Sequence, residues 1–154
     1  MKITNTSDYK VRGVKCLVYG ESGVGKTYLC GSAPVPLILS AESGLLSLAD
    51  NSIDVIEITS VKELAEAYKW LNNSEEAKHY ETICVDSLSD IAEKMLGEKL
   101  EQFKDPRQAY GDMAIQMARL IRNSRYITSR DVYFKAKTER VVDEATIKTN
   151  FMPS

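Results

Sequence analysis

Three glycines, a lysine and a threonine stand within eight residues of one another near the start of the chain, in the segment GESGVGKT. Glycine can turn several amide N–H groups toward one anion, because it has no Cβ to block the required backbone angles. The spacing matches GxxxxGK(S/T), which predicts a cradle for the phosphates of a nucleotide. The residues expected to line it are Gly20, Glu21, Ser22, Gly23, Val24, Gly25, Lys26, Thr27 and Tyr28.

The two residues that close the motif have separate expected roles. We expect Lys26 to reach the β- and γ-phosphates and Thr27 to offer its hydroxyl to Mg²⁺. A helix that begins here would point its positive dipole end at the same charge. The alternative is a glycine-rich turn without a ligand, and the apolar run 16–19 directly before the loop argues against it.

Two acidic residues are candidates to complete such a site. Asp86 ends the apolar run 82–86, where a carboxylate can hold Mg²⁺ through water, and Ser87 could hydrogen-bond beside it. Glu42 follows the apolar run 37–40 and is a candidate base that orients an attacking water. From the residues alone, an ordinary loop or helix-start carboxylate explains Glu42 equally well.

These residues must be positioned by an alternation of short apolar runs and helical stretches. Strands are predicted at 16–19, 37–39, 53–58, 82–86 and from 132 to 134, and helices at 26–31, 60–71, 87–103 and 107–128. Ser60 and Glu63 form a capping box at the start of the second helix. The alternation predicts an α/β fold, a mainly parallel sheet flanked by helices that binds ligands at the carboxyl ends of its strands.

No repeat, low-complexity tract or linker interrupts this pattern, so we expect residues 1–154 to form a single domain. A hairpin is predicted over 140–149, with its turn at 143–145. The sequence stops just after this hairpin, which leads us to expect a core that is incomplete at the C-terminus.

The composition is that of a globular protein with 44% hydrophobic residues in a chain of 154. No apolar run approaches the roughly 18 residues of a membrane span, and the polar start does not resemble a signal peptide, so we expect a cytoplasmic protein. The cysteines are odd in number and scattered along the chain, at Cys16, Cys30 and Cys84. This pattern predicts buried free thiols rather than a disulfide or a metal site. His79, the only histidine, is expected on the surface.

Charge is spread unevenly along the chain. Residues 104–140 hold nine Lys/Arg against four Asp/Glu, whereas the remainder holds 11 against 18. This excess would suit a polyanion such as nucleic acid, but a solvated helix face is the favoured interpretation. Tyr110 and Tyr126 lie among these basic residues, where aromatic rings can stack single-stranded bases. Tyr133 and Phe134 are expected to be buried, and Trp70 to pack on its helix.

The order of the segments GESGVGKT, LILSAESGL, TICVDSLSDI and VYFKAKTE resembles the ATPase core of RecA-type recombinases. It is more similar still to a bacteriophage group of small RecA-like ATPases, described as phage nucleotide-binding or AAA-family proteins and associated with single-strand annealing recombination. The resemblance covers residues 13–154. It implies ATP as the substrate and Mg²⁺ as the cofactor, in DNA recombination or repair in the host cytoplasm. Single-stranded DNA, a single-strand-binding protein and further copies of the chain are the implied partners.

The resemblance also implies roles for individual residues. Lys26 and Thr27 would serve phosphate and metal, Asp86 would be the Walker B acid, and Glu42 would be the base. RecA proteins end the corresponding strand with a polar residue, usually glutamine, that senses the γ-phosphate, and this chain has Lys137 there. Family members are longer than this chain. Arg140 is a candidate to reach a neighbouring subunit's phosphate.

Two other functions stay open at this point. A P-loop kinase would transfer the γ-phosphate to a small substrate and would need an arginine-bearing lid, for which Arg122, Arg125 and Arg130 are candidates. Glu42 favours activation of water over such a transfer. A nucleotide-binding module without turnover is the second alternative. A GTPase is disfavoured, because no (N/T)KxD motif follows a late strand.

Overall fold

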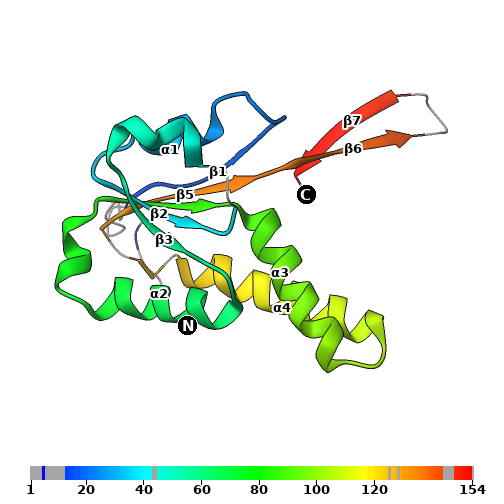
Figure 1. The fold of residues 1–154 in the computed structure, drawn as a ribbon. Coiled ribbons are helices and arrows are strands. Elements are labelled where there is room, and N and C mark those ends of the chain that lie inside the picture. Colours follow the sequence, from blue (N-terminus) through cyan, green and yellow to red (C-terminus); the bar gives the residue numbers. More distant parts are fainter. Residues whose placement is uncertain are drawn as a thin grey trace.

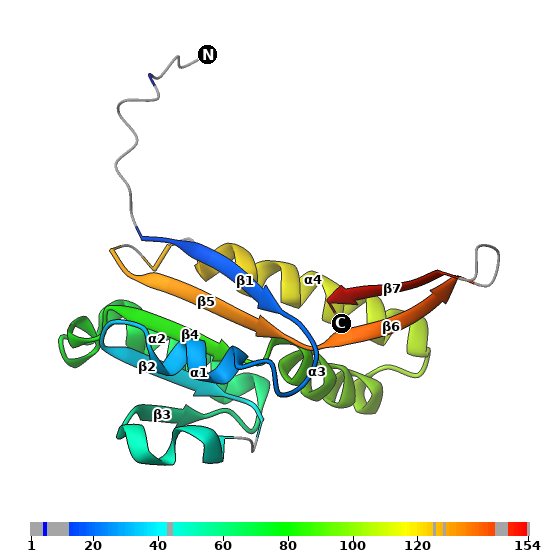
Figure 2. The same cartoon turned by 90° about the horizontal axis from the view of Figure 1, so that it is seen from above.

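The computed structural model describes residue 5 and residues 13–42, 45–124, 126–127, 129–143 and 148–153. In this part of the chain five strands form one parallel sheet. They are β1 (Lys15–Tyr19), β2 (Pro36–Ser40), β3 (Asp54–Glu57), β4 (Thr82–Asp86) and β5 (Asp131–Ala136). Their order across the sheet is β1-β5-β4-β2-β3 (Figure 2). The predicted α/β fold with a parallel sheet is therefore confirmed.

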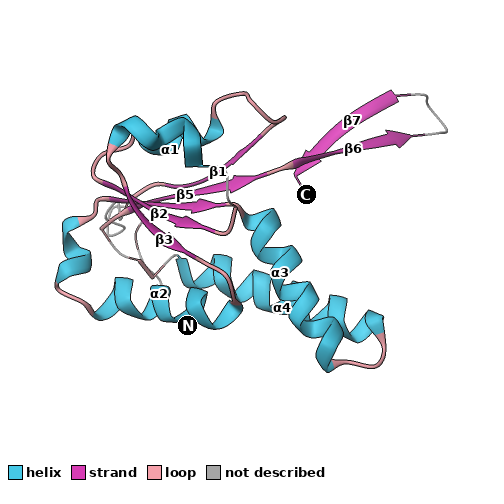
Figure 3. Ribbon diagram, in the orientation of Figure 1, coloured by secondary structure: helices cyan, strands magenta, loops and turns pink. Residues whose placement is uncertain are grey.

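Helices cover both faces of this sheet (Figures 1 and 3). One face carries α1 (Lys26–Gly31) and the 3₁₀ helix η2 (Leu45–Asn51). The other carries α2 (Val61–Asn73), α3 (Leu88–Gln102) and α4 (Pro106–Ser124). A further 3₁₀ helix, η3 (Glu76–His79), lies between α2 and β4 in the sequence. None of the described helices is long and apolar enough to cross a membrane.

The start of α2 shows how local sequence sets these boundaries. Ser60 Oγ accepts a hydrogen bond from the Glu63 N–H, as the capping box predicts. The Glu63 carboxylate bonds back to the N–H and hydroxyl of Thr59. Two groups at the helix end are thereby satisfied.

The core lies in two layers, one on each face of the sheet. The larger packs the sheet against α2, α3 and α4, with β2 and β4 contributing Leu37, Leu39, Ile83 and Val85. The smaller lies under α1 and η2 and consists of Cys30, Ile38, Leu48 and Cys84, with Tyr133 packed against it. Because side chains alternate along a strand, the next residues in that phase are Ser40, Asp86 and Lys135. These polar residues therefore face the side of the sheet that carries α1.

The structure corrects the end of one predicted helix and adds two short helices. The helix predicted at 107–128 ends at Ser124, whose hydroxyl donates to Ile121 O at 2.6 Å, and Tyr126 and Ile127 lie in turns that follow. A serine that bonds its own helix backbone competes with continuation of the helix. The 3₁₀ helices η2 and η3 were not predicted, since such short elements leave no periodic pattern.

The predicted hairpin is present with longer arms. Strand β6 (Thr138–Asp143) pairs antiparallel with β7 (Lys148–Pro153), and Asp143 is the partner of Lys148. The predicted turn at 143–145 is thus misplaced at its start, and residues 144–147 lie outside the described part of the chain. The hairpin extends away from the parallel sheet, beyond the end of β5 (Figures 1 and 2).

Several structural expectations for single residues are confirmed. The three cysteines are free, and Cys30 and Cys84 are buried, although Cys16 is only partly so. His79 is exposed in η3. Trp70 packs against the larger core and beside Tyr80, with 6.2 Å between the ring centroids.

Two isoleucines test the position of the core. Ile83 is fully buried in the central strand β4, whereas Ile115 is 54% exposed on α4. Ile83→Ala should lower the free energy of unfolding by about 2–5 kcal/mol, because it leaves a cavity. The matched Ile115→Ala should change it by less than about 1 kcal/mol, since alanine suits an exposed helix position. Urea unfolding measures both values, and similar losses would contradict the described core.

Candidate nucleotide site

The glycine-rich loop joins β1 to α1 at the carboxyl edge of the sheet. Gly23 and Gly25 have φ angles of 82° and 90°, a left-handed region that residues with a Cβ rarely adopt. Gly25 is also the N-cap of α1, and no side chain caps this helix. A residue with a Cβ would therefore be strained at Gly23 or Gly25. The N–H groups at the start of α1 also lack a capping side chain as acceptor.

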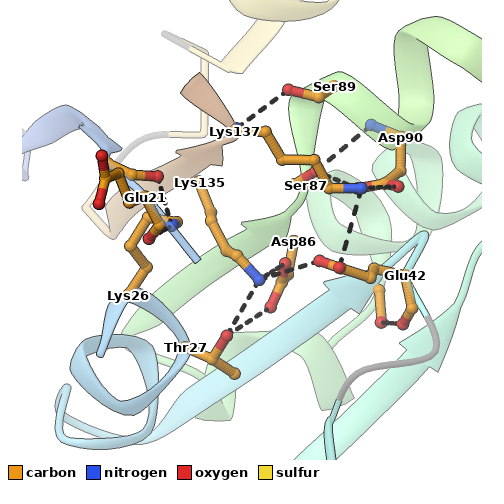
Figure 4. A network of polar contacts seen from close by, with 12 residues as sticks. Glu21, Lys26, Thr27, Glu42, Asp86, Ser87, Ser89, Asp90, Lys135 and Lys137 are labelled. Carbon is orange, nitrogen blue, oxygen red and sulfur yellow. Dashed lines mark hydrogen bonds and ion pairs between the residues drawn. The ribbon is translucent and has the colours of Figure 1, made fainter. Parts of the chain in front are cut away.

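Lys26 is turned back into its own loop. Its Nζ donates to the carbonyls of Gly20 and Glu21, at 2.6 Å each (Figure 4). Burial, together with the nearby ammonium of Lys135, holds the pKa of Lys26 below its ordinary value. A phosphate group entering the loop would have to replace these two carbonyls as the acceptor for Lys26.

Lys135 lies at the centre of the site, and sequence analysis did not identify it. Its Nζ is 2.6 Å from Asp86 Oδ1, an ion pair between two buried side chains. The same ammonium donates 3.0 Å hydrogen bonds to Thr27 Oγ1 and to Glu42 Oε2. Burial disfavours the charged lysine, but the carboxylates of Asp86 and Glu42 hold the pKa of Lys135 above its ordinary value. Figure 4 shows the ammonium surrounded by these three residues.

Three of the predicted site residues thus converge on one point. Thr27 comes from the start of α1, Asp86 from the end of β4 and Glu42 from the segment after β2. Thr27 also donates a 3.3 Å hydrogen bond to Asp86 Oδ2. The convergence follows from the parallel sheet, whose strands all end at this edge.

A signal for Lys135 was present in the sequence. It stands inside the apolar run 132–136, where a lysine must either be paired or leave the core. It also alternates in phase with Tyr133, which packs on the face that carries α1. What the sequence does not show is that β5 lies between β1 and β4, and this order brings Lys135 to Asp86.

Lys137, the predicted γ-phosphate sensor, is paired with acidic residues. Its Nζ lies 2.6 Å from Asp90 Oδ1 and 3.8 Å from Glu42 Oε1. Its backbone N–H donates to Ser89 Oγ at 3.1 Å. The hydrogen bond from Lys137 to the Asp90 carboxylate raises the pKa of Lys137 above its ordinary value, although partial burial opposes this. The sensing role stays a prediction.

Ser87 has a structural role at the start of α3. Its Oγ accepts a hydrogen bond from the Asp90 N–H at 3.3 Å and donates to the Asp90 carboxylate. Burial of Asp90 opposes its ionisation, yet the bonds from Lys137 and Ser87 hold its pKa below the ordinary range. Ser87, the residue after the predicted metal ligand Asp86, is therefore the N-cap of α3 and holds the Asp90 side chain in place.

The oxygen atoms around Lys135 fit a magnesium ion in their chemistry. Mg²⁺ prefers oxygen ligands, and proteins commonly supply one or two carboxylates while substrate phosphates and water complete the shell. In the described part of the chain no three His, Cys, Asp or Glu side chains are grouped to hold a metal on their own. The Thr27 hydroxyl and Asp86 carboxylate already surround a cation, the Lys135 ammonium. They therefore fit a metal that is shared with a bound phosphate.

A cavity of about 240 Å³ opens beside this cluster. It is lined by Ser40, Ala41, Glu42, Leu45, Glu57, Ile58, Thr59 and Lys94. A larger cavity, of about 380 Å³, lies near the amino ends of β4 and β5, between Leu71, Tyr80, Ile127 and Arg130. The larger one contains none of the residues predicted to bind phosphate or metal or to act as the base, so we take the smaller one as part of the site.

The sheet, the glycine-rich loop after β1 and the acid at the end of β4 define an α/β fold of the P-loop NTPase class. The family profile described as "AAA domain" matches residues 12–153, and the chain therefore belongs to this family. A search of curated proteins found no match. Membership of the AAA family supports nucleotide binding and hydrolysis as the general activity.

The Asp86–Lys135 pair makes a prediction about stability. Asp86→Asn and Lys135→Gln should each lower the free energy of unfolding by about 3–5 kcal/mol, because each leaves a buried charge without its main partner. The double variant should lose clearly less than the sum of the two. Urea unfolding of all four proteins measures the coupling. Additive losses would show that the two charges do not stabilise each other.

Proposed function

We propose that this protein binds ATP with Mg²⁺ and hydrolyses its β–γ phosphoanhydride, as a RecA-like ATPase. The observation that carries the proposal is the convergence of Thr27, Asp86 and Glu42 on a single cation beside the glycine-rich loop. Each of the three has the chemistry that the reaction requires at its position.

The loop and Lys26 would bind the phosphates. Backbone N–H groups at Gly23 and Gly25 would donate hydrogen bonds to the triphosphate oxygens, and Lys26 would exchange the carbonyls of Gly20 and Glu21 for the β- and γ-phosphates. Thr27 and Asp86 would hold Mg²⁺, the latter through water. When bound, this ion neutralises charge on the transferred phosphoryl group.

Glu42 would act as the base. Its side chain is about one third exposed and borders the 240 Å³ cavity, so water can reach it. The carboxylate would orient a water molecule in line with the bond between the γ-phosphorus and the bridging oxygen. As the water oxygen attacks phosphorus, this bond breaks, ADP leaves, and the water proton passes to Glu42. This arrangement favours hydrolysis over transfer to a second substrate.

Single-stranded DNA is the polyanion that we propose as the effector, in a recombination or repair setting of the bacteriophage type. Of the basic residues in 104–140, Lys135 and Lys137 lie in the acidic cluster, and Arg130 donates to Leu71 O. Exposed basic and aromatic residues along α4 and just after it support the proposal: Arg107, Tyr110, Arg119, Arg122 and Tyr126. Rings and guanidinium groups together can stack bases and pair with phosphates.

Partners and subunit contacts belong to the same proposal. We propose a single-strand-binding protein as a partner and a homo-oligomer as the active form. Arg140, whose backbone lies in β6, is the candidate for a contact with a neighbour's phosphate.

Phosphate release from ATP tests the catalytic roles. Lys26→Ala should lose both nucleotide affinity and turnover, whereas Glu42→Gln should keep affinity and lose at least about a hundredfold in turnover, the usual effect of removing a base. Glu57→Gln is the matched control, because Glu57 ends β3 at the same edge and lines the same cavity without contacting the cluster. Unchanged turnover in Glu42→Gln would overturn the base assignment. Nucleotide binding without turnover in the wild type would favour a binding module.

The DNA proposal predicts an affinity for single strands that falls with salt, because phosphate contacts release counterions. Replacing Arg107, Arg119 and Arg122 by alanine should weaken binding and reduce the salt slope by up to about 2, at about 0.7 per contact. Replacing the exposed Lys62 and Lys69 on α2 is the control and should change neither. Fluorescence anisotropy with labelled oligonucleotides measures both quantities. Binding that is insensitive to salt or to the arginine changes would argue against this surface.

A further inference from the structure

The position of Lys135 carries an inference beyond the assignment of the base and the metal ligands. Its ammonium contacts the three oxygen-bearing side chains that the proposed reaction assigns to the metal and to water. We propose that Lys135 is a built-in substitute for the metal, which occupies the metal position until a nucleotide arrives and so excludes a divalent cation from the empty site. The identity of the nucleotide rests on the proposed function, but the exclusion of the cation does not.

The position of the Lys135 ammonium supports its role as a substitute for the metal. A charged lysine at 2.6–3.0 Å from three oxygens makes the short contacts of charge-assisted bonds. The side chain is only 11% exposed and Asp86 only 2%, so little water screens the pair. A cation bound by Thr27 and, through a water molecule, by Asp86 would place itself or that water between these oxygens, where Lys135 Nζ lies. Metal and ammonium therefore exclude each other on steric and on electrostatic grounds.

The neighbouring lysine shows why the exchange centres on Lys135. Lys137 contacts Asp90 at 2.6 Å but comes no closer than 3.8 Å to Glu42, and its side chain is 42% exposed. Lys137 therefore balances the charges of Asp90 and Glu42, and its ion pairs do not include Asp86. In the described part of the chain it is Lys135 that joins all three of Thr27, Glu42 and Asp86.

A nucleotide changes this balance because it brings its own negative charge. Phosphate oxygens above the loop would offer the Lys135 ammonium new acceptors within reach of its flexible stem. Asp86 and Thr27 would then be released to a cation that the same phosphates help to bind. Metal entry is thereby coupled to nucleotide binding, and Lys135 acts as a positioning residue through the groups it releases.

The test is Mn²⁺ binding without any nucleotide, measured by electron paramagnetic resonance of the free ion. The wild type should bind Mn²⁺ weakly, and Lys135→Gln should bind it at least about tenfold more tightly, because a cation leaves the oxygen cluster. Lys135→Arg keeps the charge and should behave like the wild type. Lys137→Gln is the matched control and should change the affinity much less. Equal Mn²⁺ affinity in Lys135→Gln and the wild type would overturn the proposal.

A double variant locates the new cation site. Asp86→Asn added to Lys135→Gln should abolish the gain in Mn²⁺ affinity, and a gain that persists would overturn the proposal by showing that the ion binds elsewhere. Since no nucleotide is present, these results are independent of whether the protein hydrolyses ATP. If the protein fails to bind ATP but Lys135→Gln still tightens Mn²⁺ binding, the proposed function is refuted, whereas the proposal that Lys135 stands in for the metal is upheld.

A measurement on the wild type covers the case in which Lys135→Gln fails to fold. The buried ammonium of Lys135 should give a protected NMR signal, assigned by its loss in Lys135→Arg. Mg²⁺ alone at millimolar concentration should leave this signal unchanged, whereas Mg²⁺ with a non-hydrolysable ATP analogue should shift it. A signal that Mg²⁺ alone shifts or removes would overturn the proposal.

Discussion

The contact between Lys135 and Asp86 is the interaction on which the site depends. Two opposite charges lie 2.6 Å apart, with Asp86 fully enclosed at the end of the central strand. Neither charge could remain buried alone, because desolvation of an unpaired ion costs several kcal/mol. The pair therefore requires β5 and β4 to be neighbours. It also fixes the position of the Lys135 ammonium, which Thr27 and Glu42 both contact. The cluster of oxygen atoms is stable because the chain itself supplies this cation.

The sequence predicts most of the frame around this pair. The motif ending in Lys26 and Thr27 identifies the loop, since glycine conformation and phosphate chemistry leave few alternatives. Apolar runs predict the strands because buried parallel strands have few polar residues. Asp86 and Glu42 could be chosen because both follow such runs, and parallel strands end at one edge. These inferences rest on local patterns and on one general rule of sheet topology.

The remainder depends on contacts between distant segments. That β5 lies between β1 and β4 is a property of strand order, which no local pattern shows. The resemblance to RecA-type ATPases selected Lys137 at the strand end, whereas it is Lys135, inside the strand, that contacts Asp86. The end of α4 depends on a hydroxyl bonding its own helix, and η2 and η3 are too short for a periodic pattern. Charge counted along the chain likewise overstated the basic surface, because two of the lysines lie in the acidic cluster.

A crystal structure with Mg²⁺ and a non-hydrolysable ATP analogue would show whether Lys135 and the metal use one position. We expect a metal ion on Thr27 Oγ1, held by Asp86 through a water molecule and by the β- and γ-phosphates. Lys135 Nζ would have moved from between these two residues to the phosphate oxygens, and Lys26 would have left the carbonyls of Gly20 and Glu21. A bound analogue with Lys135 still between Thr27 and Asp86, and no metal there, would contradict the account.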